Sequence, residues 1–151
     1  MRRLAVVSVV LVFAALGCAK NNEATSSPSP VASAAATNKP AIALQGTITN
    51  KGTKAFTTEN FTLELEADNE GSQYYFKPTF IRAAGGGTAT IEFKNEGSVE
   101  HNLTIPLLKV NQDLQPGKSK TLTLEMGTDS FVPFFCKYHK ASGMQGAFNL
   151  H

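Results

Sequence analysis

The chain has 151 residues, of which 42% are hydrophobic and 17% are charged, so it has room for one domain of ordinary size and an additional segment. Its 14 basic and 12 acidic residues form no basic stripe of the kind that a nucleic-acid-binding protein carries. We therefore expect no nucleic-acid partner.

The first 17 residues have the layout of an export signal. Arg2 and Arg3 precede an apolar run over residues 4–16, which ends at small residues. This run is shorter than the roughly 20 residues that cross a bilayer as a helix, so we do not expect a permanent transmembrane anchor. Loss of Arg2 and Arg3 with the signal brings the formal net charge from +2 to zero.

The signal ends at a cysteine. Ala15-Leu16-Gly17-Cys18 resembles the lipobox of bacterial lipoproteins, in which the cysteine receives lipid and becomes the first mature residue. The alternative is an ordinary signal peptide that is cut nearby and leaves Cys18 as a free thiol. The other cysteine is Cys136, and an exported protein with two unpaired cysteines needs an explanation for each. We predict lipidation of Cys18 and anchoring at the periplasmic or another extracytoplasmic face of a membrane.

Residues 18–40 are predicted to be a disordered tether. Their composition of Ala, Ser, Thr, Asn and Pro buries too little apolar surface to offset the entropy of ordering the chain. As a flexible coil of about 22 residues, the tether spans roughly 25 Å on average. The predicted organisation is therefore a signal peptide over 1–17, a tether over 18–40 and a folded domain over 41–151.

The domain is predicted to consist of strands. Phe61, Leu63, Leu65 and Ala67 alternate with polar residues at period two, and the same alternation occurs over 89–94 and 121–126. Shorter strands are predicted over residues 42–49, 76–83, 101–105, 131–136 and 145–150. Residues 107–114 can hold a turn of helix, and turn signals stand at 50–52, 85–87, 95–97 and 115–117. The pattern indicates an all-β antiparallel sandwich or barrel.

Three candidate metal ligands lie close together, from the end of the predicted strand over 131–136 onward. These are Cys136, His139 and Met144, and His101 lies at the start of an upstream strand. Two imidazoles, one thiolate and a weak thioether suit copper in electron transfer. Zinc is the main alternative, but structural zinc prefers four firm ligands and the predicted domain has one cysteine. The terminal His151 can replace Met144 or extend the site, although a chain end holds a ligand poorly.

The chain resembles the type I blue copper proteins of the cupredoxin family, and plastocyanin in particular. The resemblance rests on Ile91-Glu-Phe-Lys-Asn-Glu-Gly, on Glu100-His-Asn-Leu-Thr-Ile and on Phe134-Phe-Cys-Lys-Tyr-His-Lys-Ala-Ser-Gly-Met-Gln-Gly. It implies a Greek-key antiparallel β-sandwich that holds one copper ion, cycling between Cu(I) and Cu(II), on His101, Cys136, His139 and Met144.

The resemblance also implies a brace for the loop over residues 136–144, which we call the ligand loop. Asn102 matches the Asn that follows the first histidine in the family, where its backbone amide approaches the cysteine sulfur. Its usual Ser or Thr partner, directly after the cysteine, is replaced by Lys137. Phe135 stands where plastocyanins carry Tyr, and the segment over 41–73 matches less clearly and can be an extra strand or hairpin.

The expected function is the transfer of single electrons between exported or membrane redox proteins. We expect a monomer that has no small-molecule substrate and is not an enzyme. The resemblance implies electron exit at His139, with Pro106, Leu107, Ala141 and Gly143 as candidates for a surrounding apolar patch. The alternative is a protein of the cell envelope that stores or delivers copper. A third possibility, a structural adhesion sandwich, would leave the set of candidate ligands unexplained.

Overall fold

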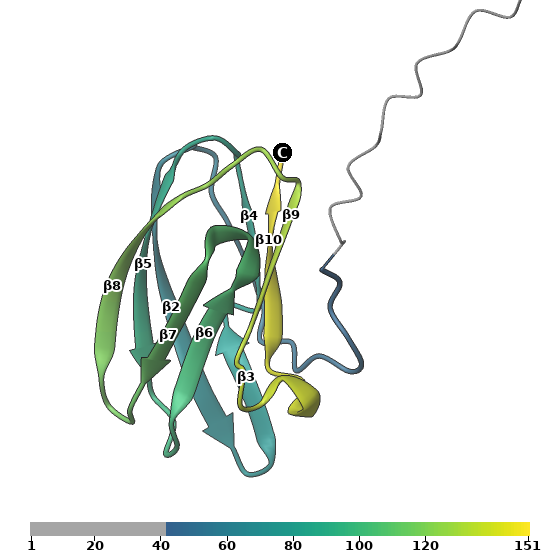
Figure 1. Cartoon of the computed structure of the whole chain (residues 1–151), viewed down its shortest axis with the longest axis vertical. Helices are drawn as coiled ribbons and strands as arrows, with labels where there is room; N and C mark the ends of the chain where they lie inside the picture. Colours follow the sequence, from purple (N-terminus) through teal and green to yellow (C-terminus); the bar gives the residue numbers. More distant parts are fainter. Residues whose placement is uncertain (1–41) are drawn as a thin grey trace, which may run out of the picture. The chain divides into compact units, whose positions relative to one another are not determined.

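The computed structural model describes residues 42–151. The predicted signal peptide, Cys18 and the predicted tether lie outside the described residues. The described part consists of two β-sheets that face each other, joined by loops and two short 3-10 turns (Figure 1). Among the described residues, no helix has the length and apolar character needed to cross a bilayer.

The first sheet has six strands in the spatial order β1-β4-β10-β9-β6-β7. Their bounds are Thr53–Ala55 for β1, Phe80–Ala83 for β4, His101–Ile105 for β6, Val110–Leu114 for β7, Phe131–Phe135 for β9 and Gln145–Leu150 for β10. The second sheet has the order β3-β2-β5-β8. Its strands are β2 (Phe61–Glu70), β3 (Gln73–Lys77), β5 (Thr88–Asn95) and β8 (Ser119–Glu125). The 3-10 turns are η1 (Pro106–Leu108) and η2 (Lys140–Ser142).

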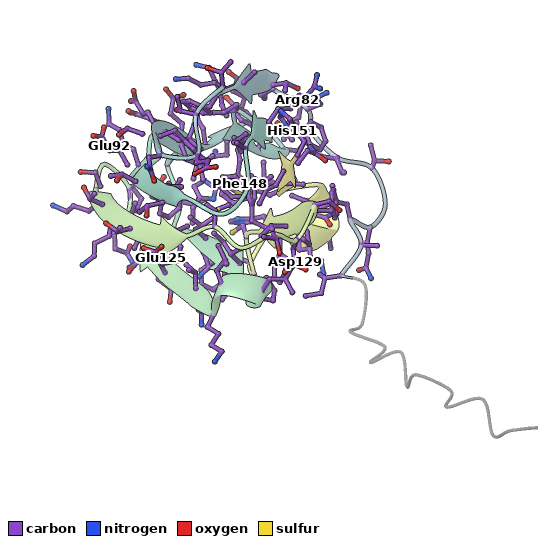
Figure 2. All side chains as sticks on the ribbon, turned by 90° about the horizontal axis from the view of Figure 1, so that it is seen from above. Arg82, Glu92, Glu125, Asp129, Phe148 and His151 are labelled. Atoms are coloured by element: carbon purple, nitrogen blue, oxygen red, sulfur yellow. The ribbon has the colours of Figure 1, made fainter. Side chains whose placement is uncertain are left out.

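The hydrophobic core lies between the two sheets because the strands present every second side chain to it. On β2 the apolar residues at positions 61, 63, 65 and 67 are buried, and the residues between them are exposed or half-buried. Phe76 of β3 packs edge-on against Phe134 of β9, with 5.1 Å between the ring centroids, and so joins the two sheets. Phe148 of β10 lies in the interior, whereas Glu92 and Glu125 lie at the outer surface (Figure 2). The sandwich predicted from the alternation is confirmed.

The strand pairing is more varied than the predicted antiparallel pattern. β2 pairs with β5 in parallel, and β4 pairs in parallel with both β1 and β10. These partners are separated in the chain by other strands, so no tight hairpin forces them to run in opposite directions. Strands that follow one another, such as β2 and β3 or β6 and β7, are antiparallel hairpins.

Several predicted elements differ from the structure in detail. Residues 42–49 form no strand, and β1 lies further along the chain. The strand predicted over 76–83 is divided into β3 and β4 at Pro78, which has no N–H to donate to a sheet. Residues 107–114 hold both the turn η1 and the strand β7, since Lys109 adopts a left-handed conformation with φ of 55° and reverses the chain. The predicted strands over 101–105 and 145–150 match β6 and β10.

Candidate metal centre

The topology brings His101 next to the loop that contains Cys136 and His139. β6 and β9 are antiparallel neighbours in which Thr104 pairs with Phe135. Residues that precede Thr104 therefore lie alongside residues that follow Phe135. The beginning of β6 and the turn between β9 and β10 consequently occupy the same end of the sandwich (Figure 1).

His101, Cys136 and His139 form one compact cluster of possible metal donors. Their ligand atoms all lie within 4.8 Å of one another, and the Cys136 Sγ is 3.5 Å from the His139 Nδ1. The two imidazole rings are 5.1 Å apart between centroids and inclined by 68°. Cys136 and His101 are fully buried, and His139 is half-buried. Two imidazoles and one thiol thus converge on a site that is closed on the protein side and reaches the surface at His139.

The hydrogen bonding of His101 indicates that this cluster holds a metal ion. Both ring nitrogens of His101 are buried, and neither has a hydrogen-bond partner among the described residues. Buried polar groups in proteins are nearly always paired, since an unpaired group loses its hydration without compensation. A metal ion between the three donors gives one of these nitrogens a partner. His101, Cys136 and His139 are therefore positioned as a copper site, and this donor set matches a single type I copper.

The protonation of the two histidines also favours metal binding. Burial, with a smaller contribution from the nearby His139, lowers the pKa of His101 to about 4. Burial also lowers the pKa of His139. Both imidazoles are consequently neutral at pH 7, and a neutral imidazole has the free lone pair that a metal requires.

Burial disfavours the metal-binding form of Cys136, unlike that of the two histidines. Burial raises its pKa, and the backbone N–H groups of Tyr138, Asn102 and His139 partly offset this effect. The metal-free protein therefore carries a neutral thiol at pH 7. Since the thiolate is the ligand, metal uptake releases a proton from Cys136.

Asn102 makes two contacts with the segment that begins at Cys136. Its backbone amide is directed to the sulfur of Cys136, and its side-chain Oδ1 accepts a hydrogen bond from the Lys137 N–H at 3.3 Å. The hydroxyl that is missing at position 137 is replaced by that of Thr104, which donates to the same Oδ1. Asn102 and Thr104 thus bond each other within β6, and Asn102 links this strand to the chain directly after Cys136.

Asp113 also binds this region, and it is not among the candidate site residues predicted from the sequence. It lies on β7 opposite Asn102, and its carboxylate accepts hydrogen bonds from the Asn102 Nδ2 at 2.8 Å and from the Tyr138 hydroxyl at 3.1 Å. Its ion pair with the Lys137 Nζ, at 2.7 Å, is the main reason for its lowered pKa. A hairpin predicted over 101–114 would have paired Asn102 with Asp113 and revealed this contact.

Met144 is buried directly before β10 and is tied to the ligand loop through its backbone. Its N–H donates to the carbonyl of His139 at 3.2 Å, and its carbonyl accepts from the N–H of Cys136 at 3.1 Å. His151, in contrast, follows the far end of β10, roughly 20 Å along the strand from Met144. His151 consequently does not extend the site.

Two further contacts at the loop had no signal in the sequence. The ring of Tyr74, on β3, stacks on the imidazole of His139. In addition, Gln145 and Gly143 bind the backbone of the segment that precedes β1. The Gln145 side chain accepts a hydrogen bond from the Gln45 N–H at 3.0 Å and donates one to the Gln45 carbonyl, and the Gly143 carbonyl accepts from the Thr49 N–H at 3.1 Å.

The apolar patch predicted around His139 has a different composition in the structure. Pro106 and Leu107 follow the far end of β6 from His101, and Gly143 is buried, whereas Ala141 is exposed. The exposed large apolar residues near the cluster are Val99 and Tyr138. Each lies within two residues of a residue of the cluster.

A two-sheet sandwich that holds two imidazoles and a thiol at one end defines the class of copper-binding β-sandwich proteins. The chain belongs to the cupredoxin family, because the sequence model of the cupredoxin-like domain matches residues 8–148. No match is found among the curated proteins.

Solved structures of the same fold include copper proteins of several kinds. Auracyanin A, a "blue" copper protein from Chloroflexus aurantiacus, has 18% sequence identity and a TM-score of 0.51 over 61% of this chain and 99% of its own. Auracyanin B has 17% identity and a TM-score of 0.50 over 64% of this chain and 91% of its own. The copper nitrite reductase from Nitrosomonas europaea has 19% identity and a TM-score of 0.51, but the match covers 41% of that longer chain.

Proposed function

We propose that the protein is a type I copper electron carrier that is held at the outer face of a membrane by lipid on Cys18. The observation that carries the proposal is the buried cluster of His101, Cys136 and His139, in which both nitrogens of His101 lack another partner among the described residues. We assign Met144 as the weak axial ligand, supported by its burial and by its backbone bonds to Cys136 and His139. When bound, copper supplies a one-electron couple between Cu(I) and Cu(II).

The protein supplies a rigid and dry environment for this couple. The backbone of His101 is held in strand β6, and Cys136 directly follows β9 and donates its N–H to the Met144 carbonyl, so the backbones that carry both side chains are fixed. The N–H groups directed to the Cys136 sulfur stabilise its thiolate. Burial of Cys136 and His101 excludes water, which limits the rearrangement that accompanies a change of charge. These features support a carrier over an enzyme, since a substrate would need access to the centre.

Electrons are proposed to pass at the exposed part of His139. Tyr138, whose ring centroid is 6.3 Å from that of His139, and Val99, two residues before His101, are 48% and 36% exposed and offer apolar side chains from which a redox partner can displace water. Lys137 is paired with Asp113 and is therefore not a free positive charge for an acidic partner. We expect apolar contact to dominate docking with exported or membrane redox proteins.

Addition of Cu(II) to the purified domain tests the electronic assignment. We expect one equivalent of copper, an intense visible thiolate-to-copper band and the electron paramagnetic resonance spectrum of a type I site. Cys136→Ser should abolish the band while the far-ultraviolet circular dichroism is retained, because the core of the sandwich does not depend on this thiol. Full copper occupancy of the wild-type protein without the band would contradict the proposal.

Retention of copper through redox cycles distinguishes an electron carrier from a protein that stores or delivers copper. A carrier should keep its copper when reduced and reoxidised repeatedly in the presence of a Cu(I) chelator. Loss of copper on reduction would favour delivery instead.

The lipid anchor has its own test. Mass spectrometry of membrane-extracted protein should find acyl mass on Cys18, and Cys18→Ser should release the protein from the membrane. A free N-terminus at another residue would contradict lipidation.

A further inference from the structure

The ring of Tyr74 covers one face of the half-buried histidine of the cluster. The centroids of Tyr74 and His139 are 4.0 Å apart, and the two ring planes are inclined by 6°. The same tyrosine meets His101 nearly edge-on, with 6.3 Å between centroids and an angle of 71°. One aromatic side chain thus touches both imidazoles.

Tyr74 reaches the cluster from the opposite sheet. His101 begins β6, and Cys136 and His139 lie in the loop between β9 and β10, so all three are attached to the six-stranded sheet. Tyr74 lies on β3 of the four-stranded sheet, where it pairs with Asn69 of β2. Its backbone is therefore held independently of the ligand loop.

The local structure around His139 explains why such a contact matters. His139 precedes the short turn η2, and its ring is half-buried, whereas His101 is enclosed by the sandwich. Tyr138 approaches the His139 ring at 6.3 Å and 63°, but Tyr138 is itself exposed. The His139 ring also meets the Cys136 Sγ at its Nδ1 and the His101 ring nearly edge-on, but the stack with Tyr74 is the ring contact that lies parallel to its plane.

We propose that Tyr74 is a positioning residue for the copper centre, which clamps His139 by stacking and fixes the direction of its Nδ1 lone pair. This inference rests on the proposed copper site but concerns a residue outside the ligand set. The stack uses the aromatic ring and not the phenolic hydroxyl. Tyr74→Phe should therefore behave as the wild-type protein, whereas Tyr74→Leu keeps bulk and loses the aromatic face.

The first test is nuclear magnetic resonance of the copper-free protein. In the wild-type protein and in Tyr74→Phe, the ring protons of His139 should be shifted upfield by the stacked aromatic ring. The shift should be lost in Tyr74→Leu and in Tyr74→Ala. This measurement needs no copper, so it distinguishes failure of the clamp from failure of the proposed function. Unchanged His139 shifts in Tyr74→Leu would overturn the inference.

The second test uses the copper-loaded protein. Loss of an aromatic stack should weaken Cu(I) binding by roughly two- to tenfold in competition with a chelator, and Tyr74→Phe should restore it. The reduction potential and the electron paramagnetic resonance parameters should change in Tyr74→Leu but not in Tyr74→Phe. Phe131→Ala, which removes an exposed aromatic residue at the far end of β9, is the matched control. Equal changes in Tyr74→Phe and Tyr74→Leu would exclude the stack as their cause.

Discussion

Asp113 and Asn102 face each other across the β6–β7 hairpin, and their side chains are joined by a hydrogen bond of 2.8 Å. Both also bond the chain directly after Cys136, so the pair connects the hairpin with the ligand loop. We expect Asp113→Ala to lower the free energy of unfolding by about 1–2 kcal/mol, because three donors lose their acceptor at a partly solvated position. Copper affinity should fall by roughly 10- to 100-fold.

Asp113→Asn is the matched comparison for this prediction. It keeps an oxygen acceptor but removes the charge that pairs with Lys137. Its stability should lie between those of the wild-type protein and Asp113→Ala in urea denaturation. An Asp113→Ala protein with unchanged copper affinity would show that the ligand loop holds its geometry without β7.

Gly97 provides the space in which the His101 ring lies. A Cβ at this position would be 2.7 Å from the His101 Nε2 and 2.5 Å from the Asn69 Oδ1. Gly97→Ala must therefore displace at least one of these side chains. We expect a loss of stability of about 1–3 kcal/mol and an altered type I electron paramagnetic resonance spectrum. Gly127→Ala is the control, since a Cβ there meets no atom within 4 Å, and an unchanged spectrum in Gly97→Ala would contradict the prediction.

The stability of the copper-free protein should decrease as the pH falls from about 6.5 to about 4. In this range His101 remains neutral in the folded state, where its pKa is about 4, but takes a proton in the unfolded state, where its pKa is ordinary. The unfolded state therefore binds more protons, and the stabilisation present at higher pH is lost, by up to roughly 3 kcal/mol. The lowered pKa of His139 acts in the same direction.

Urea denaturation over this pH range measures the effect. His101→Gln cannot take a proton in this range, so its profile should be flatter than that of the wild-type protein. Copper loading should instead steepen the profile, because unfolding releases the metal and the unfolded chain then also takes up the proton that Cys136 lost on metal uptake. Parallel profiles for wild type and His101→Gln would show that another group causes the pH dependence.

The buried side chain of Gln145 binds the backbone of Gln45 through both its oxygen and its nitrogen. Gln145→Ala removes both bonds and leaves these groups without their partners, which should cost about 1–3 kcal/mol. The amide protons of Gln45 and Thr49 should exchange faster with solvent in this variant. Gln115→Ala, at an exposed turn, should leave both exchange rates unchanged. Equal rates in wild type and Gln145→Ala would mean that the segment is held by other contacts.

The strands with a buried and an exposed face could be predicted from the sequence because their alternation is periodic. Phe61, Leu63 and Leu65 show this for β2, and the candidate ligands followed from the chemistry of Cys136, His139 and His101. The strand β7 was missed because its sequence, from Val110 to Leu114, has a weak alternation. Asp113, which lies on β7, was consequently missed as well.

Contacts between distant segments could not be predicted in the same way. Tyr74 and His139 are brought together by the packing of two sheets, and no local pattern in the sequence encodes that packing. Residues 42–49 are apolar enough to predict a strand, but their backbone groups bind Gln145 and Gly143 instead of a neighbouring strand. Parallel pairing of β2 with β5 likewise depends on the course of the intervening chain.

The attachment of Gln45 and Thr49 to the ligand loop also determines how a mechanical load enters the domain. Along the described chain from Ile42, the first bonds to another segment are those between Gln45 and Gln145, followed by the bond from Thr49 to Gly143. A pull on the chain before Ile42 therefore acts first on Gly143 and on Gln145 at the start of β10, the two residues on either side of Met144. Tension on this side of the domain would reach the metal site first.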